Sequence, residues 1–378
     1  MKNILSLLFI SISLIANEKL THDLPMTLDL DDQAYRQVVV DREQDQYLGH
    51  PTTCLLEDGK TILCVYPKGH GRGEIVYKKS IDSGLTWSDR LPTPINWKTS
   101  KEVPTLHRVI GPDGKKRIIM WSGLYPSRLA VSEDDGGNWS PLKEAGDWGG
   151  IVVMGFVESV GLKKGHYLAM FHDDGRFYAK NGKKTGIFTL FKTFSEDGGL
   201  TWQKPEEVFK SGEVHLCEPG FIRSPDGKRI AVLLRENSRR KNSHIIFSED
   251  EGKTWSSPRE LPISLTGDRH IGKYAPDGRL FISFRCRSPK KLAGTRTYEG
   301  DWVGWIGTWD DLVQGKHGQY SIRLKDNKKS YDCAYPGLEL LPNGTFVVTT
   351  YGHWSAGQAP YILSVRLRLD ELDRMAKK

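Results

Sequence analysis

Arginine, histidine, tyrosine and carboxylate side chains recur in this chain where short β-rich runs begin or end. Glu218 starts one run, Arg235 closes the next, and Tyr335 starts a later one. Arginine binds anionic groups through paired, charge-assisted hydrogen bonds, and acids and histidines transfer protons. Connecting loops are usually rich in serine, asparagine and glycine instead, so these residue types indicate a site for a small anionic ligand.

The positions of this kind form two groups. The starts of runs carry His50, His107 with Arg108, Glu218, Arg269 with His270, and Tyr335. The ends of runs carry residues 68–72, residues 172–176, Arg235 with Glu236, Arg285 with Arg287, and residues 351–354. The residues that we expect to bind the ligand are Arg235, Arg285, Arg269, His50, Arg108, Arg72, Asp173 and His353.

The elements that must position these residues are marked by a repeated turn. A turn dipeptide followed by a β-rich run occurs six times, at Asp58-Gly59, Asp113-Gly114, Lys164-Gly165, Asp226-Gly227, Asp277-Gly278 and Asn343-Gly344. Successive glycines are 55, 51, 62, 51 and 66 residues apart, which is the length of a four-stranded blade with its loops. The turns predict an all-β fold, with residues 17–378 forming a single six-bladed β-propeller.

A second, independent repeat has the pattern S-x-D-x-G-x-T-W. It occurs at residues 80–87, 195–202 and 248–255, and once with asparagine in place of threonine at residues 132–139. Its glycine supplies a turn conformation that other residues resist, and its serine and aspartate side chains bind local backbone amides. We interpret this unit, called the clip below, as a structural lock on a β-hairpin and not as a metal site.

Strand direction separates both repeats from the candidate site. If the repeated turn joins the first two strands of a blade, the start of the first strand and the end of the second lie at the opposite face. The clips fall between the third and fourth strands, so they share the side of the turns. We therefore expect the face opposite Glu218 and Tyr335 to carry Asp82, Asp134, Asp197 and Asp250.

Both ends of the chain carry signals of their own. Residues 1–16 have the pattern of a cleaved secretory signal, with Lys2 before an apolar run that is too short to span a bilayer. The sequence thus predicts a secreted or periplasmic protein with no membrane span. Ring closure should pair a strand near residues 37–40 with the last strand near residues 361–369, and residues 370–378 should form a short helix.

Composition narrows the partners. The formal net charge of +7 falls to +6 on removal of the signal, and the basic residues are dispersed, whereas nucleic-acid binding usually needs a continuous basic stripe. Five cysteines without a C-x-x-C pair indicate neither a disulfide framework nor a zinc site, and we expect them buried in strands. Motifs for phosphate, zinc or calcium binding are missing from the sequence, so we expect no cofactor and no metal.

Two longer segments resemble the sialidase (neuraminidase) superfamily. CEPGFIRSPDGKRIAVLLREN, residues 217–237, is similar to the family segment in which a glutamate opens one strand and an arginine closes the next. AYPGLELLPNGTFVVTTYG, residues 334–352, is similar to the segment that opens with the nucleophilic tyrosine. The clips resemble the family's Asp boxes, so the likeness covers nearly the whole mature chain. The resemblance implies Tyr335 as nucleophile, Glu218 as its general base and Arg235 as a carboxylate-binding arginine.

The implied chemistry explains why these residue types occur together. A sialic acid carries a carboxylate at its anomeric carbon, which would repel a carboxylate nucleophile. A neutral tyrosine activated by a glutamate avoids that repulsion. The resemblance therefore implies a retaining exo-glycosidase that releases a terminal anionic sugar.

At two places the chain departs from the family pattern. LGHPTTCLL, residues 48–56, replaces the Arg-Ile-Pro motif that carries the first arginine, and His50 stands near that place. YPKGHGRGE, residues 66–74, lacks the usual acidic aspartate, which leaves His70 or Glu74 as the general acid. The candidates for the third arginine are Arg285, Arg287 and Arg269. A related anionic sugar, such as a uronic acid or a sulfated unit, would also suit this basic pocket.

Two other functional classes fit the same scaffold. One is a polysaccharide lyase or a histidine-dependent glycosidase, and the other is a propeller that binds glycans without turnover. An unsaturated product that absorbs ultraviolet light would mark the lyase, and binding without product would mark the lectin. In each case the expected partner is an anionic glycan or glycoconjugate.

Overall fold

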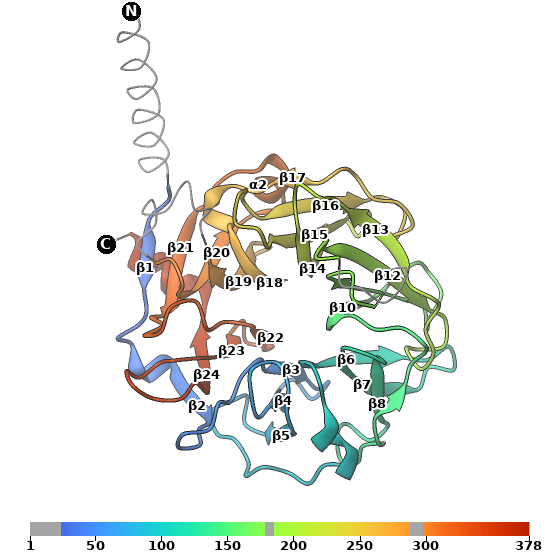
Figure 1. Ribbon diagram of the computed structural model, residues 1–378. Helices are drawn as coiled ribbons and strands as arrows, with labels where there is room; N and C mark the ends of the chain where they lie inside the picture. Colours follow the sequence, from blue (N-terminus) through green and yellow to red (C-terminus); the bar gives the residue numbers. More distant parts are fainter. Residues whose placement is uncertain (1–23, 178–184, 288–297, 378) are drawn as a thin grey trace, which may run out of the picture.

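Six sheets stand in a ring and form a six-bladed β-propeller, as predicted (Figure 1). The computed structural model describes residues 24–177, 185–287 and 298–377. The predicted signal, residues 1–16, lies outside these described residues. Within them, no helix combines the length and the apolar character needed to cross a membrane.

Blades I to IV follow one another along the chain. Blade I consists of β3 Thr52–Leu55, β4 Ile62–Pro67 and β5 Ile75–Ser80. Blade II consists of β6 Pro104–Ile110, β7 Lys116–Ser122, β8 Arg128–Ser132 and β9 Lys143–Glu144. Blade III consists of β10 Ile151–Ser159, β11 Tyr167–Asp173, β12 Thr189–Ser195 and β13 Glu206–Lys210. Blade IV consists of β14 Leu216–Arg223, β15 Ile230–Glu236, β16 His244–Ser248 and β17 Arg259–Glu260.

Blades V and VI combine segments from both ends of the chain. Blade V consists of β18 Gly267–Tyr274, β19 Leu280–Cys286, β20 Trp302–Gly307, β21 Tyr320–Lys325 and the outer strand β1 Thr27–Asp29. Blade VI consists of β22 Gly337–Leu340, β23 Phe346–Gly352, β24 Tyr361–Leu367 and the outer strand β2 Gln37–Asp41. The helices of the described residues are α2 Trp309–Gln314 and α3 Leu369–Ala376, with short 3-10 turns at Ala34–Arg36, Ile95–Thr99 and Ile263–Leu265.

The predicted ring closure is confirmed, because β2 pairs antiparallel with β24 and joins the first strands of the chain to its last blade. Helix α3 follows β24, as expected. The expectation of four strands in every blade is wrong for blade I, which has three. Pro92 and Pro94 follow its clip, and proline has no backbone N–H to donate to a fourth strand. The parallel pairing of β1 with β21 was not anticipated.

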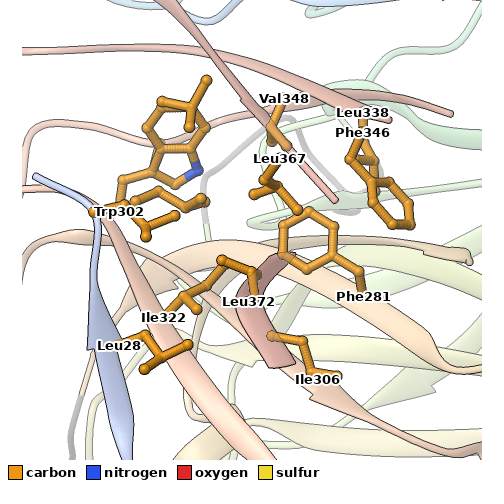
Figure 2. Packing of buried hydrophobic residues seen from close by; sticks show 14 of the residues in the cluster. Leu28, Phe281, Trp302, Ile306, Ile322, Leu338, Phe346, Val348, Leu367 and Leu372 are labelled. Atoms are coloured by element: carbon orange, nitrogen blue, oxygen red, sulfur yellow. The ribbon is translucent and has the colours of Figure 1, made fainter. Parts of the chain in front are cut away.

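Apolar side chains fill the space between adjacent blades. Between blades V and VI, Phe281 and Phe346 are fully buried and pack edge to face with ring centroids 5.0 Å apart (Figure 2). Leu28 of β1 and Leu372 of α3 belong to the same cluster, so β1 and α3 both cover this part of the core. Truncating a buried phenylalanine of this kind to alanine costs about 3–5 kcal/mol.

The strand register puts the clips at the face opposite Glu218, as expected. In blade IV, Ser248 at the start of the clip pairs with Ile230, at the beginning of β15. Arg235 near the other end of β15 pairs with Cys217, next to Glu218. Blade I repeats this arrangement, because Ser80 pairs with Ile62 at the beginning of β4.

The clips hold their turns as predicted. In the first clip, Asp82 accepts hydrogen bonds from the backbone N–H groups of Leu85 (3.1 Å) and Thr86 (2.9 Å), and the Ser80 hydroxyl accepts one from Gly84 (2.8 Å). The Thr86 hydroxyl also donates to Asp82 at 2.6 Å. One carboxylate thus satisfies several donors of a tight turn.

All five cysteines lie within the described part of the chain, and all are buried. Four of them, Cys54, Cys64, Cys217 and Cys286, lie in strands, as predicted. Cys333 lies outside the named strands, although an isolated bridge pairs it with Gly352.

The clip geometry predicts a stability effect without a functional one. Asp82→Ala should lower the free energy of unfolding by about 1–2 kcal/mol, because it leaves turn donors without their acceptor. Asp89→Ala, an exposed aspartate shortly after the same clip, is the matched control and should change it by less than about 0.5 kcal/mol. Urea titration measures both, and an equal effect of the two substitutions would contradict the structural role of the clip.

Candidate active site

Near the start of the first strand of several blades lies a residue in the left-handed region, which aims its side chain away from the regular strand pattern. The φ angles are 53° for His50, 53° for Glu218, 54° for Arg269 and 58° for Ala334. In blade IV the register shifts between Cys217 and Gly220, so β14 carries one extra residue there. Bulges of this kind re-aim side chains next to functional sites, at a cost of about 1–3 kcal/mol for the strained residue.

Glu218, Tyr335 and Arg235 meet at the wall of a cavity of about 290 Å³. The Tyr335 hydroxyl donates a hydrogen bond to Glu218 Oε1. Arg235 Nη1 donates to the same oxygen and, at 3.1 Å, to the Tyr335 hydroxyl. The second carboxylate oxygen of Glu218 is buried and has no hydrogen-bond partner among the described residues.

The charges of this group favour an ionised glutamate beside a neutral tyrosine. Burial alone would raise the pKa of Glu218, but Arg235 and the Tyr335 hydroxyl hold it below its ordinary value. Burial and the neighbouring Glu218 carboxylate raise the pKa of Tyr335 far above its ordinary value. The carboxylate is therefore placed to accept the tyrosine proton when that oxygen attacks an electrophile.

Behind this group lies Asp268, which has no exposed surface. It accepts hydrogen bonds from Arg285 Nε (2.8 Å) and Nη2 (2.6 Å) and from Arg239 Nη2 (3.0 Å), and Arg235 Nε lies 3.3 Å away. Burial would raise the pKa of Asp268, but these three arginines hold it well below its ordinary value. Asp268 thereby fixes the direction of Arg235.

Two histidines form another wall of the cavity. His50 accepts a hydrogen bond from the Gly71 N–H at 3.2 Å, and its ring lies 4.6 Å from the Tyr335 ring. Burial lowers the pKa of His50 well below its ordinary value, so it is neutral. His70 Nδ1 lies 2.7 Å from the Tyr47 hydroxyl and 3.3 Å from Asp332 Oδ1.

Blade III supplies a third wall. His172 Nδ1 accepts a hydrogen bond from the Glu218 N–H at 3.3 Å, and burial lowers the pKa of His172 to about 3. Asp174 accepts hydrogen bonds from Arg176 Nε and Nη2, both at 2.7 Å. His172 therefore supports the backbone of Glu218 as a neutral ring, and the Arg176 charge is balanced locally.

Glu102 is a lining residue that sequence reasoning missed. It lines the 290 Å³ cavity and also an adjoining cavity of about 990 Å³. Burial raises the pKa of Glu102 to about 7, and the nearby Glu218 carboxylate contributes to the rise. A carboxyl group with such a pKa can both give and take a proton near neutral pH.

The structure places several predicted site residues away from the 290 Å³ cavity. Arg108 lies within β6, because that strand begins at Pro104, and it pairs with Glu57 at 2.7 Å. Glu74 faces Lys98 at 3.9 Å instead of the cavity. Asp173 is buried and accepts a hydrogen bond from the Gly175 N–H at 2.8 Å, so it stabilises a turn. These three placements correct the expectation that all the candidates share one pocket.

Other predicted residues lie behind or beside the cavity lining. Arg285 lies behind Tyr335, with its guanidinium carbon 5.5 Å from the ring centroid, and His353 Nε2 lies 2.9 Å from Asp332. Arg269 lines a separate cavity of about 170 Å³, and Arg72 lines the 990 Å³ cavity. Of the catalytic candidates, the structure brings together Tyr335, Glu218 and His70, with Arg235 and His50 beside them.

Among the described residues, no group of three or more histidine, cysteine, aspartate or glutamate side chains is placed to hold a metal ion. Proton transfer and nucleophilic attack are the chemistry that these side chains can supply themselves.

Known proteins share this architecture. Residues 116–291 match the BNR repeat-like domain family. A sialidase of Clostridium perfringens is 27% identical over 251 residues, which cover 64% of this chain and 56% of that protein. The chain thus spans just over half the length of this relative.

Two solved structures have the same fold. An α-L-arabinofuranosidase of Fusarium graminearum is 13% identical, with a TM-score of 0.64 over 89% of this chain and 99% of that chain. A leech intramolecular trans-sialidase is 15% identical, with a TM-score of 0.60 over 87% of this chain and 69% of that chain. Together with the repeat match, these likenesses show that the chain has the β-propeller fold of these proteins. The chain is thus similar to BNR-repeat proteins over residues 116–291 and to a sialidase over 251 residues.

The buried ion cluster predicts a large effect of one substitution. Asp268→Asn should lower the free energy of unfolding by about 3–5 kcal/mol, because it leaves buried guanidinium groups without their counter-charge. Since the folded-state pKa of Asp268 is depressed, this stabilisation is complete above about pH 4 and fades as the pH falls toward the folded-state pKa.

Asp277→Asn is the control for that experiment. Asp277 is itself exposed, and its partner Arg279 also pairs with Asp373, so the substitution should change stability by less than about 1 kcal/mol. Denaturant unfolding at pH 7 compares the two proteins. Similar losses of unfolding free energy in the two variants would show that the ion cluster around Asp268 does not stabilise the site.

Proposed function

We propose that this chain is a glycoside hydrolase of sialidase-like mechanism that releases a terminal acidic sugar with retention of anomeric configuration. The observation that carries the proposal is the Tyr335 hydroxyl, which donates a hydrogen bond to an ionised Glu218 at the wall of a small cavity. A volume of about 290 Å³ lies at the lower end of small-molecule sites and suits a single terminal sugar.

The first step transfers the sugar to the enzyme. Tyr335 Oη attacks the anomeric carbon while its proton passes to Glu218, and the glycosidic C–O bond breaks. The leaving oxygen takes the proton of the Glu102 carboxyl group. Arg235, which contacts both Glu218 and Tyr335, stabilises the charge that moves between them.

The second step restores the enzyme. The Glu102 carboxylate takes a proton from a water molecule, and that oxygen attacks the anomeric carbon. The bond from the sugar to Tyr335 Oη breaks, and Tyr335 regains its proton from Glu218. Two displacements at one carbon retain its configuration.

Glu102 takes the role of general acid and base because of its place between the two cavities. A sugar in the smaller cavity would have its leaving group in the larger one, so the bond to be cleaved would lie beside Glu102. His70 also lines both cavities, but Tyr47 and Asp332 already engage its Nδ1 atom. Glu74 faces Lys98 outside the lining.

The preference for an acidic sugar rests on Arg235. Its Nη2 atom makes no hydrogen bond within the described part of the chain, so one arm of the guanidinium is available for a substrate carboxylate. A neutral sugar is the second candidate, because Glu218, Asp268 and Asp174 already balance the arginine charges of the lining. The shared fold with an α-L-arabinofuranosidase supports this second candidate. We also propose export of the protein, on the strength of the residue 1–16 pattern.

Substrate charge separates the two candidates. For a panel of aryl glycosides of acidic sugars, each paired with its methyl ester, we expect kcat/KM to be at least about 10-fold higher for the free acid, which is the size of one charge-assisted hydrogen bond. Equal rates for acid and ester, or turnover of arabinofuranosides alone, would favour the neutral-sugar enzyme.

The pH dependence tests the role of Glu102. Glu102 must be protonated in the first step, so the rate should fall as the pH rises through about 7. Glu218 must be ionised, so the rate should also fall at acid pH, below the ordinary pKa of a glutamate. Glu102→Gln should remove the alkaline limb and lower kcat by about 10²- to 10⁴-fold on substrates with poor leaving groups, and by much less on dinitrophenyl glycosides.

His70→Asn is the comparison for this experiment, because His70 is the other candidate acid at the same junction. An alkaline limb that persists in Glu102→Gln and disappears in His70→Asn would reverse the assignment.

A further inference from the structure

The larger cavity continues directly from the small one. The two share a border formed by His70, Gly71, Glu102, Ile151 and Arg176. With about 990 Å³ against 290 Å³, the larger cavity has room for more than one further sugar unit. In the proposed reaction this is the place of the leaving group.

Basic side chains dominate the lining of the larger cavity. Its charged residues are Lys68, Arg72, Lys101, Arg176 and Glu102. Glu102 has the only carboxyl group among the described residues of the lining. Because its pKa is raised to about 7, this group is largely protonated in mildly acidic solution. The lining therefore carries an excess of positive charge.

Two of these cations have no acidic partner among the residues that the structure describes. Arg176 pairs with Asp174 at 2.7 Å, and Lys68 lies 3.4 Å from Glu43. Arg72, by contrast, makes no hydrogen bond or ion pair with the described residues, and Lys101 donates only to the Tyr125 carbonyl, at 3.2 Å. Both side chains are exposed, so they can turn toward a ligand.

The backbone that carries these two cations is fixed. The Gly73 N–H donates to the Ser100 carbonyl at 3.3 Å, which joins the loop of Arg72 to the segment of Lys101. Gly73 has a φ of 121°, and a Cβ there would lie 2.3 Å from the Lys68 carbonyl oxygen, so only glycine fits. The backbone segments that carry the two cations are thus joined on neighbouring walls of one cavity before any ligand binds.

We propose that Arg72 and Lys101 bind an anionic group, a carboxylate or a sulfate ester, on the leaving-group part of the substrate. This inference rests on the proposed function for the orientation of the substrate, but the binding site itself does not require turnover. It makes the substrate an anionic glycan that is recognised by charge on both sides of the cleaved bond. The small cavity binds the terminal sugar, and the large cavity recognises the charge of the sugar that follows it.

Direct binding tests the proposal without any need for catalysis. Isothermal titration would compare three trisaccharide probes, namely trigalacturonate, a 6-sulfated galactotriose and neutral galactotriose. The wild type should bind at least one anionic probe more tightly than the neutral one, and added salt should weaken that preference. Arg72→Ala and Lys101→Ala should each weaken anionic binding by about 2- to 5-fold, and the double variant by roughly 10-fold, with neutral binding unchanged. The two anionic probes distinguish carboxylate from sulfate recognition.

Lys98→Ala is the matched control, because Lys98 is an exposed lysine near the same segment that does not line the cavity. It should bind all three probes like the wild type. Equal affinity of the wild type for all three probes would overturn the proposal, and so would an anionic preference that is as large in the double variant as in the wild type. Either result would leave the glycosidase proposal standing, whereas charge-dependent binding without any turnover would support the anion site and count against the glycosidase.

Discussion

Asp268 has no exposed surface, and its carboxylate lies among three guanidinium groups. A buried carboxylate is expensive to desolvate, and it is stable here because Arg235, Arg239 and Arg285 surround it. The same interaction fixes the arginines. Arg235 Nη1 then donates hydrogen bonds to Glu218 and Tyr335, and Arg285 lies behind the Tyr335 ring. The proposed nucleophile pair thus depends on a carboxylate that would never touch the substrate.

The arrangement of the two cavities gives each proposed catalytic group a distinct environment. Tyr335 and Glu218 line only the small cavity, where burial and Arg235 set their protonation. Glu102 lies where the small cavity opens into the large one, and its raised pKa fits a group that both donates and accepts a proton. Two carboxyl groups of the same chemical type therefore differ in charge near neutral pH, because one has an arginine partner and the other does not.

The sequence predicted the blade number, the ring closure and the face of the site, because each depends on local turn chemistry and strand direction. It also predicted the meeting of Glu218, Tyr335 and Arg235, which stand at fixed places in the repeat. His50, Glu218, Arg269 and Tyr335 each precede the glycine of the next turn by nine residues. Nine residues before Gly114 stands Thr105, and not the His107 that we expected at this place. This spacing would have placed the start of the strand closer to Glu102. Asp268 gave no such signal, because its role arises only from three arginines that approach it from different parts of the fold.

The central claim is that Tyr335 and Glu218 act by double displacement, and the configuration of the first product tests it most directly. Proton NMR during hydrolysis of the best aryl glycoside would record which anomer forms before mutarotation. We predict the anomer of the substrate, because two displacements at one carbon restore its configuration. Initial release of the opposite anomer would show a single displacement by water and would contradict the account of Tyr335 as the nucleophile.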